Sequence, residues 1–419
     1  MKSLLLRNLV SLYGIQLATL ILPLLTLPYL TRVLGPAAWG QLAAVQALAI
    51  TLSLVVEFGF GYSATRAVAQ QRGNTSALAR IAAGVLGAKL FLLLSLLLVA
   101  TIIYALAPAF RQSPALYCWG IVFAAVQGFA PLWYFQGQER LQQAAALDIA
   151  GRVVATAGIF LLVRVPEQAW RVLALYAVMI GLAQVINTFR MYRELPFVLP
   201  AWTTTVESLR AGFSMFLFRG ATSLYLSANS ALLRLYLPGA QVGYYANAER
   251  LAAAGKSMVQ PITQALFPRV SHLVQHDGEA ARSLLRRSLL LMLAVSCAAA
   301  LGLFMAAPWF VPLFFGAAYQ PSVPLLQALI VTLPIVAASN VLGLQWMLPN
   351  GQDRAFNAIV VAAGLLNIVL VMLLVPRYGS QGMAWSVITT ESVITLSMAL
   401  YILRQPDHPF RKQQLPQAL

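Results

Sequence analysis

The chain has 419 residues, of which 60% are hydrophobic and only 10% are charged. A soluble globular domain carries roughly 25% charged residues, and no soluble fold of this size could bury so many apolar side chains. Intrinsic disorder requires low hydrophobicity, and two cysteines are too few for a secreted disulfide scaffold, so the composition indicates a polytopic membrane protein.

Twelve apolar segments are long enough to cross a bilayer, for which a helix needs about 20 residues. Gly/Pro turns or short charged loops separate them, and these end helices. The sequence therefore predicts an all-α integral membrane protein with about twelve transmembrane helices. The predicted spans are residues 9–31, 38–60, 81–106, 115–135, 147–163, 172–190, 211–236, 242–266, 288–311, 322–347, 356–375 and 381–403.

The net charge of +16 is distributed unevenly between the two sides of these spans. If the N-terminus is cytoplasmic, the cytoplasmic segments hold seventeen Arg and Lys residues and the outside loops hold five. Cytoplasmic loops are enriched in Arg and Lys, so both termini are expected in the cytoplasm. The loops are short, and no soluble domain is expected.

A weak internal repeat relates the two halves of the chain. At an offset of 203 residues Gly40 aligns with Gly243, Leu48 with Leu251 and Arg66 with Arg269. In both halves a span, a short Pro/Gly turn, a second span and an Arg-containing loop follow one another. The alternative is a chance likeness between two pairs of membrane helices joined by a turn.

The repeat predicts two pseudo-symmetric six-helix lobes. The N-terminal lobe is residues 1–195 with spans 1–6, the C-terminal lobe is 196–403 with spans 7–12, and a short cytoplasmic tail follows at 404–419. An even number of spans makes the two lobes parallel repeats about an axis along the membrane normal. Transporters with such repeats place their substrate site at the repeat interface.

Several short motifs carry a resemblance to a known family. They are Asn8, the Leu22-Pro23 and Leu27-Pro28 pairs, Tyr29 to Gly35, Trp39-Gly40, Glu57 to Gly61, Ala64 to Arg66, Val242 to Tyr245, and Phe267 to Arg269. With these motifs the chain resembles the Wzx-type polysaccharide flippases of the multidrug/oligosaccharidyl-lipid/polysaccharide exporter superfamily. The motifs are mostly helix-packing and turn residues, so they identify the family better than the substrate.

The resemblance implies a function. The protein would move undecaprenyl-diphosphate-linked oligosaccharide repeat units from the cytoplasmic to the periplasmic face of the bacterial inner membrane. It would do so by alternating access around a cationic cavity, for the synthesis of surface polysaccharide such as O-antigen. Its partners would be this glycan lipid, membrane lipids, a polysaccharide polymerase and a chain-length regulator, with no cofactor and no nucleic acid.

Basic residues inside the spans are the candidates for binding the diphosphate. A charged residue at the centre of a span costs about 2.5–3.5 kcal/mol on insertion scales, so it usually faces a bundle interior or a wet cavity. Arg219, Arg250 and Lys256 are the strongest candidates, because cationic donors match phosphate oxygens. Lys89 and Arg234 are weaker ones. The alternative is that these residues pair with acidic side chains and lock helices together, which we favour for Lys89 and Arg234.

Acidic residues inside or near the spans have two interpretations. Glu391 has no partner nearby in the sequence, and it could pair with a cavity Arg or bind a coupling proton. Glu249 could neutralise the adjacent Arg250, and Glu57 could form part of an inner gate or support packing. Asp148 and Arg152 are four residues apart, which predicts a local ion pair on one helix face.

Two other functions were weighed against a flippase. A cation-coupled multidrug exporter of the same superfamily should place carboxylates in its cavity, whereas the charge inside these spans is mostly basic. An integral-membrane glycosyltransferase or polymerase usually has long outside loops with catalytic residues, and the loops here are too short. No nucleotide-binding or metal-ligand motif is evident, and His272 and His276 alone do not predict a metal site. The protein is therefore expected not to be an enzyme.

Overall fold

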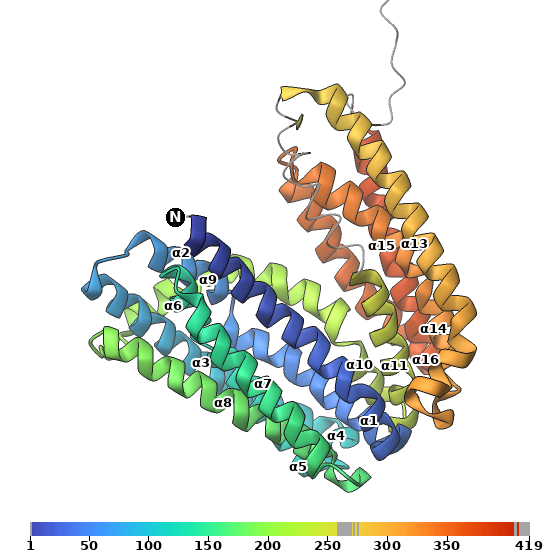
Figure 1. Cartoon of the computed structure of the whole chain (residues 1–419), viewed down its shortest axis with the longest axis horizontal. Helices are drawn as coiled ribbons and strands as arrows, with labels where there is room; N and C mark the ends of the chain where they lie inside the picture. The colour runs from blue at the N-terminus through green and yellow to red at the C-terminus, as the bar shows by residue number, and fades with distance from the viewer. Residues whose placement is uncertain (1, 258–269, 271–272, 275, 406–408, 410–419) are drawn as a thin grey trace, which may run out of the picture. The chain divides into compact units, whose positions relative to one another are not determined.

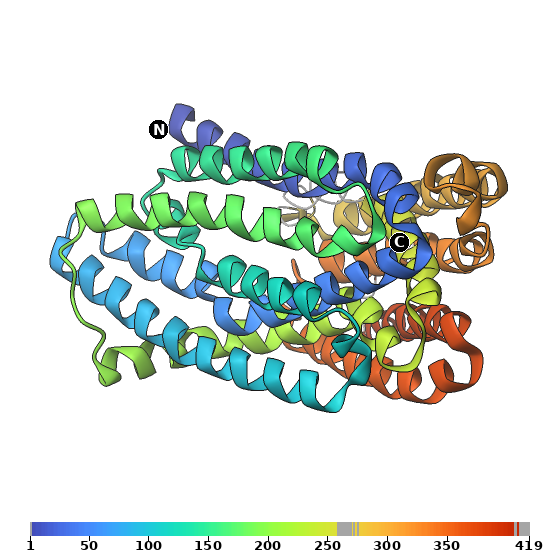
Figure 2. The ribbon, with the colours of Figure 1, turned by 90° about the horizontal axis from the view of Figure 1, so that it is seen from below.

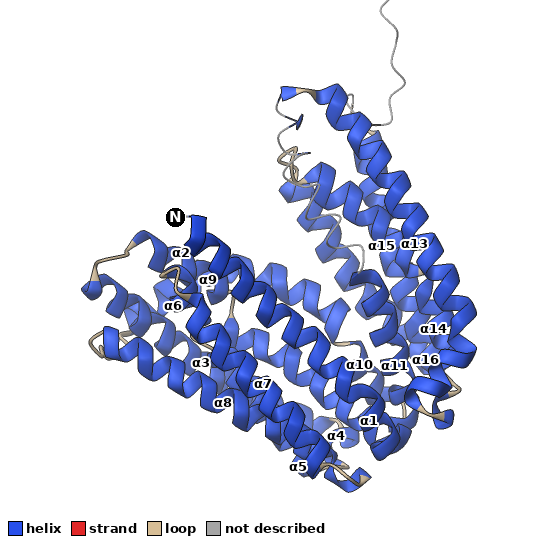
Figure 3. Cartoon of the chain, in the orientation of Figure 1, coloured by secondary structure: helices blue, strands red, loops and turns tan. Residues whose placement is uncertain are grey.

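The computed structural model describes residues 2–257, 270, 273–274, 276–405 and 409. Over these residues the chain folds into helices, turns and short loops, without any strand (Figure 1, Figure 3). Because lipid offers the backbone no hydrogen-bond partners, a helix that satisfies its own backbone is the expected solution for apolar segments.

The N-terminal part of the chain contains long helices joined by tight turns. They are α1 (Lys2–Glu57), α2 (Phe60–Gln70), α3 (Thr75–Leu106), α4 (Pro108–Arg111), α5 (Pro114–Phe129), α6 (Leu132–Gly137), α7 (Leu141–Leu162), the 3-10 helix η1 (Pro166–Gln168), α8 (Ala169–Glu194), α9 (Trp202–Ser227), α10 (Asn229–Tyr236) and α11 (Gly239–Ser257).

The C-terminal part contains two very long helices and a chain of short ones between them. They are α13 (Gly278–Phe315), the 3-10 helix η2 (Ala317–Tyr319), α14 (Ser322–Ile330), α15 (Thr332–Asn340), η3 (Val341–Met347) and α16 (Asp353–Leu403). The segment η3 is a π-helix.

The helices confirm the predicted fold class of an all-α integral membrane protein. Eight helical stretches of the described chain are long and apolar enough to cross a membrane. Two of them, Leu24–Gln70 with 47 residues and Asp353–Leu403 with 51, have room for two spans each. The helices α1 and α16 bend where Gly35 (φ 68°) and Gly379 (φ 60°) leave the helical conformation, at the turns predicted between spans 1 and 2 and between spans 11 and 12. Part of predicted span 242–266 lies outside the described residues.

Two compact units make up the chain. The first is Met1–Gly243 with Phe314–Ala318, and the second is Tyr244–Leu313 with Tyr319–Leu419. The sequence placed its lobe boundary at residue 195, before α9 and α10. In the structure α9 packs against α3, α2 and α1, and α10 packs against α1, so both helices belong to the first unit.

Within the first unit the long helices lie side by side. Helix α1 packs against α5 and α7, and α8 packs against the same two helices (Figure 2). A buried cluster that includes Phe58, Phe60, Trp133 and Tyr134 fills the end of the unit where α2, α3 and α6 meet. Phe58 stacks on Phe216 of α9, with ring centroids 4.5 Å apart.

The two glycines that the internal repeat aligned are in contact with each other. A Cβ atom on Gly40 would overlap the carbonyl oxygen of Gly239 and lie 2.5 Å from the backbone nitrogen of Gly243. A Cβ atom on Gly243 would lie 2.5 Å from the carbonyl oxygen of Pro36. The repeated turn therefore brings two backbones together at a point where no side chain fits, which is how small residues act in membrane helix packing.

Candidate functional site

The predicted basic residues fall into two groups according to their surroundings. Lys89 and Arg234 are buried in the first unit, with exposed fractions of 3% and 5%. Arg250 and Lys256 lie half-buried on α11, in the second unit. Arg219 is part of α9, and its side chain lies outside the described residues.

Arg234 joins the end of α10 to the segment that follows α3. Its guanidinium donates to the carbonyl oxygens of Leu237 (3.0 Å) and Ala109 (3.1 Å) and to the side-chain oxygen of Gln112 (2.5 Å). Leu237 directly follows α10, so this cation also caps the carbonyl end of its own helix, where positive charge is favourable. All three acceptors are neutral, and the arrangement holds two chain segments together.

Lys89 has an equivalent role at the break between α5 and α6. Its ammonium group donates to the carbonyl oxygen of Ala130, 3.1 Å away. Pro131 follows this residue and has no N–H, so the helix ends here and leaves carbonyls without helical partners. Lys89 therefore caps α5.

Glu57 lies at the junction of α1 and α2, within electrostatic reach of Lys89. Its Oε1 accepts the backbone N–H of Gly61 at 2.9 Å. A carboxylate at a helix N-terminus is favourable for the same reason that a cation is favourable at a C-terminus. The structure thus places Glu57 at the start of α2 and Lys89 at the end of α5, where each charge binds backbone at a helix end.

In the second unit the predicted charges lie on α11 and α16. Glu249 accepts a hydrogen bond from Tyr245, one turn earlier on α11 (3.2 Å). Glu391 is buried on α16 with an exposed fraction of 6%, and the charge of Lys256 acts on it. The structure therefore brings Lys256 and Glu391 into one electrostatic neighbourhood.

The predicted local pair on α7 is confirmed. Nε of Arg152 lies 2.7 Å from Oδ2 of Asp148, whose side chain is 2% exposed. The amide of Gln184 on α8 donates to the other oxygen of Asp148 at 3.1 Å. The pair therefore also connects two helices, which the spacing of four residues alone did not predict.

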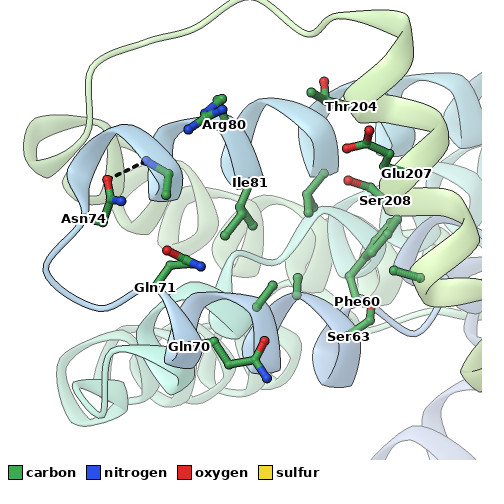
Figure 4. A pocket seen from close by; sticks show the side chains of 15 residues that line it. Phe60, Ser63, Gln70, Gln71, Asn74, Arg80, Ile81, Thr204, Glu207 and Ser208 are labelled. Carbon is green, nitrogen blue, oxygen red and sulfur yellow. Dashed lines mark hydrogen bonds between the residues drawn. The ribbon is translucent and has the colours of Figure 1, made fainter.

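A pocket that the sequence did not predict opens between α2, α3 and α9. It has a volume of about 490 Å³. Gln71, Asn74 and Arg80 line it on one side, and Glu207 and Ser208 of α9 line it on the other (Figure 4). The floor is apolar and is formed by the buried or half-buried side chains of Phe60, Ala64, Ile81 and Val85.

The predicted spans end at residue 60 and begin again at residue 81, so much of the lining of this pocket belongs to a segment that was not predicted to be helical. In the structure α2 continues to Gln70, and α3 begins at Thr75, where Asn74 accepts the backbone N–H of Ala77 (3.1 Å). A signal was present in the sequence, since residues 60–70 place apolar side chains on one helical face, at Phe60, Ala64 and Val68. No pattern in the local sequence indicates that α2 and α3 lie close to α9.

Over the described residues no group of three or more His, Cys, Asp or Glu side chains could hold a metal ion. His276 is one of the described residues, whereas His272 lies outside them. The chemistry that the described polar groups offer is recognition through charge and hydrogen bonds.

Comparison with known proteins identifies the family. The family model described as "Polysaccharide biosynthesis protein" matches residues 5–274. The chain belongs to this family. Two relatives of this chain bear the name "Putative O-antigen transporter". The one from Escherichia coli (strain K12) is 29% identical over 404 residues, covering 94% of this chain and 96% of the relative. The one from Shigella dysenteriae is 27% identical over 403 residues, covering 94% and 98%.

Solved structures share the fold of this chain. The lipid II flippase MurJ in its inward closed conformation has a TM-score of 0.70 at 13% identity, covering 97% of this chain and 89% of that one. The multidrug transporter DinF-BH has a TM-score of 0.54 at 17% identity, covering 98% and 96%. The family match confirms the predicted relation to a polysaccharide family, and the two solved structures show that the chain shares the fold of these transporters. These are names of transporters rather than enzymes, in agreement with the expectation from the short loops.

Proposed function

We propose that this protein is a flippase for lipid-linked oligosaccharides. The observation that carries the proposal is the family match over residues 5–274 of an all-helical membrane protein. The names of the two relatives, which are those of O-antigen transporters, support it.

In the finer form of the proposal, the substrate is an undecaprenyl-diphosphate-linked repeat unit. The protein resides in the inner membrane with both termini in the cytoplasm, and alternating access carries the repeat unit to the periplasmic face. A polysaccharide polymerase and a chain-length regulator then act on the same glycan lipid. Seventeen basic residues on the cytoplasmic side against five outside support this orientation.

Arg219, Arg250 and Lys256 are the residues that we propose bind the diphosphate. Two phosphate groups require cationic donors, and an Arg side chain offers two parallel hydrogen bonds to phosphate oxygens. Glu391 is our candidate for a coupling or ion-pairing group, because it is buried and the charge of Lys256 acts on it. We assign Lys89, Arg234 and Glu57 to the support of helix ends, since each binds backbone there.

Deletion in the native host tests the function. Surface glycan should disappear, and complete diphosphate-linked repeat units should accumulate on the inner face of the membrane. The location of the glycan lipid is measured by its accessibility to an enzyme or lectin added outside spheroplasts. Repeat units that still reach the outer face, or that are incomplete, would contradict the proposal and favour a drug exporter or an enzyme.

Charge reversal tests the diphosphate site. The double variant Arg219→Glu with Lys256→Glu should reduce glycan export by at least about tenfold, because two attractive charges become repulsive. The matched control is Arg190→Glu with Arg287→Glu, two exposed basic residues on α8 and α13. Equal amounts of both proteins in the membrane with undiminished export by the first would overturn the assignment.

A further inference from the structure

The pocket between α2, α3 and α9 combines an apolar floor with a polar rim. Its volume of about 490 Å³ lies within the range of about 300–1,000 Å³ that is usual for small-ligand sites. Side chains from three helices and one turn converge on it (Figure 4). All of these segments belong to the first unit, so the pocket is complete within one compact part of the molecule.

The charges on the rim favour a neutral ligand. Arg80 of α3 and Glu207 of α9 both line the pocket and have exposed side chains. In the described part of the chain the two side chains form no ion pair with each other. The two charges cancel, so the pocket has no net charge that would attract an anion or a cation, whereas a neutral polar ligand can form hydrogen bonds with both side chains.

The remaining rim groups both donate and accept hydrogen bonds. The amide side chains of Gln70 and Gln71 and the hydroxyl group of Ser208 can each do either, and the Ser63 hydroxyl, which donates to the carbonyl oxygen of Gly59 (3.3 Å), can still accept. The oxygen of Asn74 is engaged at the start of α3, where it accepts from Ser76 and Ala77. Mixed donors and acceptors match a ligand whose groups are hydroxyls, because each hydroxyl also donates and accepts.

We propose that this pocket binds sugar residues of the transported glycan. A sugar ring presents hydroxyl groups at its edge and C–H groups on its faces, which suits the polar rim and the apolar floor. An acyl chain would leave the polar groups of the rim without partners, and a diphosphate would find a single cation, Arg80, opposed by the charge of Glu207. The inference rests on the proposed flippase function and adds a glycan contact separate from the candidate diphosphate residues.

The position of the pocket suggests when it acts. The turn at Gln71–Asn74 and the segment before α9 are both predicted to be cytoplasmic. Sugars of a repeat unit face the cytoplasm before transport, so the pocket would hold the glycan at the start of the cycle. Recognition here would let the protein distinguish among repeat units that carry the same diphosphate.

Binding of free glycan by the full-length protein tests the proposal. The probe is the oligosaccharide repeat unit released by mild acid from the lipid-linked intermediate of the host, with inorganic pyrophosphate as a second probe. Saturation-transfer NMR and calorimetry on detergent-solubilised protein measure binding. Glu207→Gln and Arg80→Gln should each weaken the affinity for the oligosaccharide by about tenfold and leave pyrophosphate binding unchanged.

Two kinds of variant keep the test independent of folding. Ala67→Leu removes no polar group but fills part of the pocket, and it should weaken oligosaccharide binding as well. Glu279→Gln and Arg287→Gln on α13 are the matched controls and should bind as the unchanged protein does. Thermal unfolding of each purified variant should stay within a few degrees of that of the unchanged protein.

The outcomes separate this inference from the proposed function. If deletion abolishes flipping but Glu207→Gln, Arg80→Gln and Ala67→Leu all bind oligosaccharide and export glycan normally, the pocket assignment is wrong and the flippase stands. If pyrophosphate binding falls with the pocket variants, the site binds anions and the sugar assignment is overturned. If deletion leaves glycan lipid distribution unchanged, the proposed function itself fails.

Discussion

At the scale of single residues, the buried charges of the first unit are satisfied by specific neighbours. Lys89 binds the carbonyl oxygen of Ala130, and Arg234 binds three neutral oxygens. Asp148 accepts from both Arg152 and Gln184. A buried charge without such partners costs several kcal/mol, so these contacts explain how charged residues persist within apolar helices.

Lys89 allows a structural role to be separated from substrate binding. Lys89→Gln keeps a donor for the carbonyl oxygen of Ala130, so the protein should remain folded and export glycan at close to the normal rate. Lys89→Leu leaves that carbonyl unpaired and should lower the unfolding free energy by about 1–3 kcal/mol. Thermal unfolding and surface glycan are measured for both. Loss of export in a stable Lys89→Gln protein would instead assign the charge to the substrate.

The Asp148–Arg152 pair should contribute more to stability than an exposed pair. Asp148→Asn removes the negative charge of the buried pair and leaves the charge of Arg152 uncompensated. We therefore expect the free energy of unfolding to fall by about 3 kcal/mol. Glu139→Gln is the control, because the Arg72–Glu139 pair is 38% and 47% exposed, and its loss should cost under about 1 kcal/mol. Denaturant titration in micelles compares the two, and equal losses would contradict this account.

At the scale of helices, close backbone contacts position α9 on the first unit. A Cβ atom on Gly84 of α3 would lie 2.6 Å from Oγ of Ser208 and 2.7 Å from the carbonyl oxygen of Thr204. A Cβ atom on Gly212 of α9 would lie 2.6 Å from the carbonyl oxygen of Phe58. Thr204 and Ser208 also line the pocket, so the packing of α3 on α9 determines the width of that pocket.

Gly84→Ala should therefore push α9 away from α3. The added methyl group meets backbone as well as a side chain, so we expect a loss of about 1–3 kcal/mol in unfolding free energy. Gly302→Ala is the matched control, because a Cβ atom at Gly302 meets nothing within 4 Å, and alanine favours a helix by up to about 1 kcal/mol over glycine. Similar melting temperatures for the two variants would contradict the close packing of α3 and α9.

Helix positions were predictable from the sequence to the extent that their signals are local. Apolar length marks the spans, and the bends at Gly35 and Gly379 occur at predicted turns. The continuation of α2 to Gln70 was not predicted, because polar residues at the end of a membrane helix also resemble a loop. The pocket was missed for a further reason, since Arg80 and Glu207 are brought together only by the packing of α3 on α9.

At the scale of the whole molecule, the sequence predicted the fold class. Its lobe boundary at residue 195 differs from the division into compact units, in which the first unit continues to Gly243. Hydropathy counts spans well because a bilayer imposes their length. It does not reveal that α9 packs against α3 and α1 or that α10 packs against α1. The roles of Arg219, Arg250 and Lys256 remain predictions, because the sequence shows that a charge lies within a span but not what it binds.

The orientation in the membrane is the prediction on which the transport direction depends. Helix α8 has 26 residues, about 39 Å at 1.5 Å per residue, so the exposed residues Glu167 and Val198 at its two ends lie on opposite sides of a bilayer. The charge bias predicts Glu167 outside and Val198 in the cytoplasm. In a background with Cys118→Ser and Cys297→Ser, a membrane-impermeant maleimide should label Glu167→Cys in intact spheroplasts and Val198→Cys only after lysis. The reverse pattern would place the pocket of α2, α3 and α9 on the outer side, where a sugar could bind only after transport. The labelling therefore decides whether that pocket can receive the glycan or only release it.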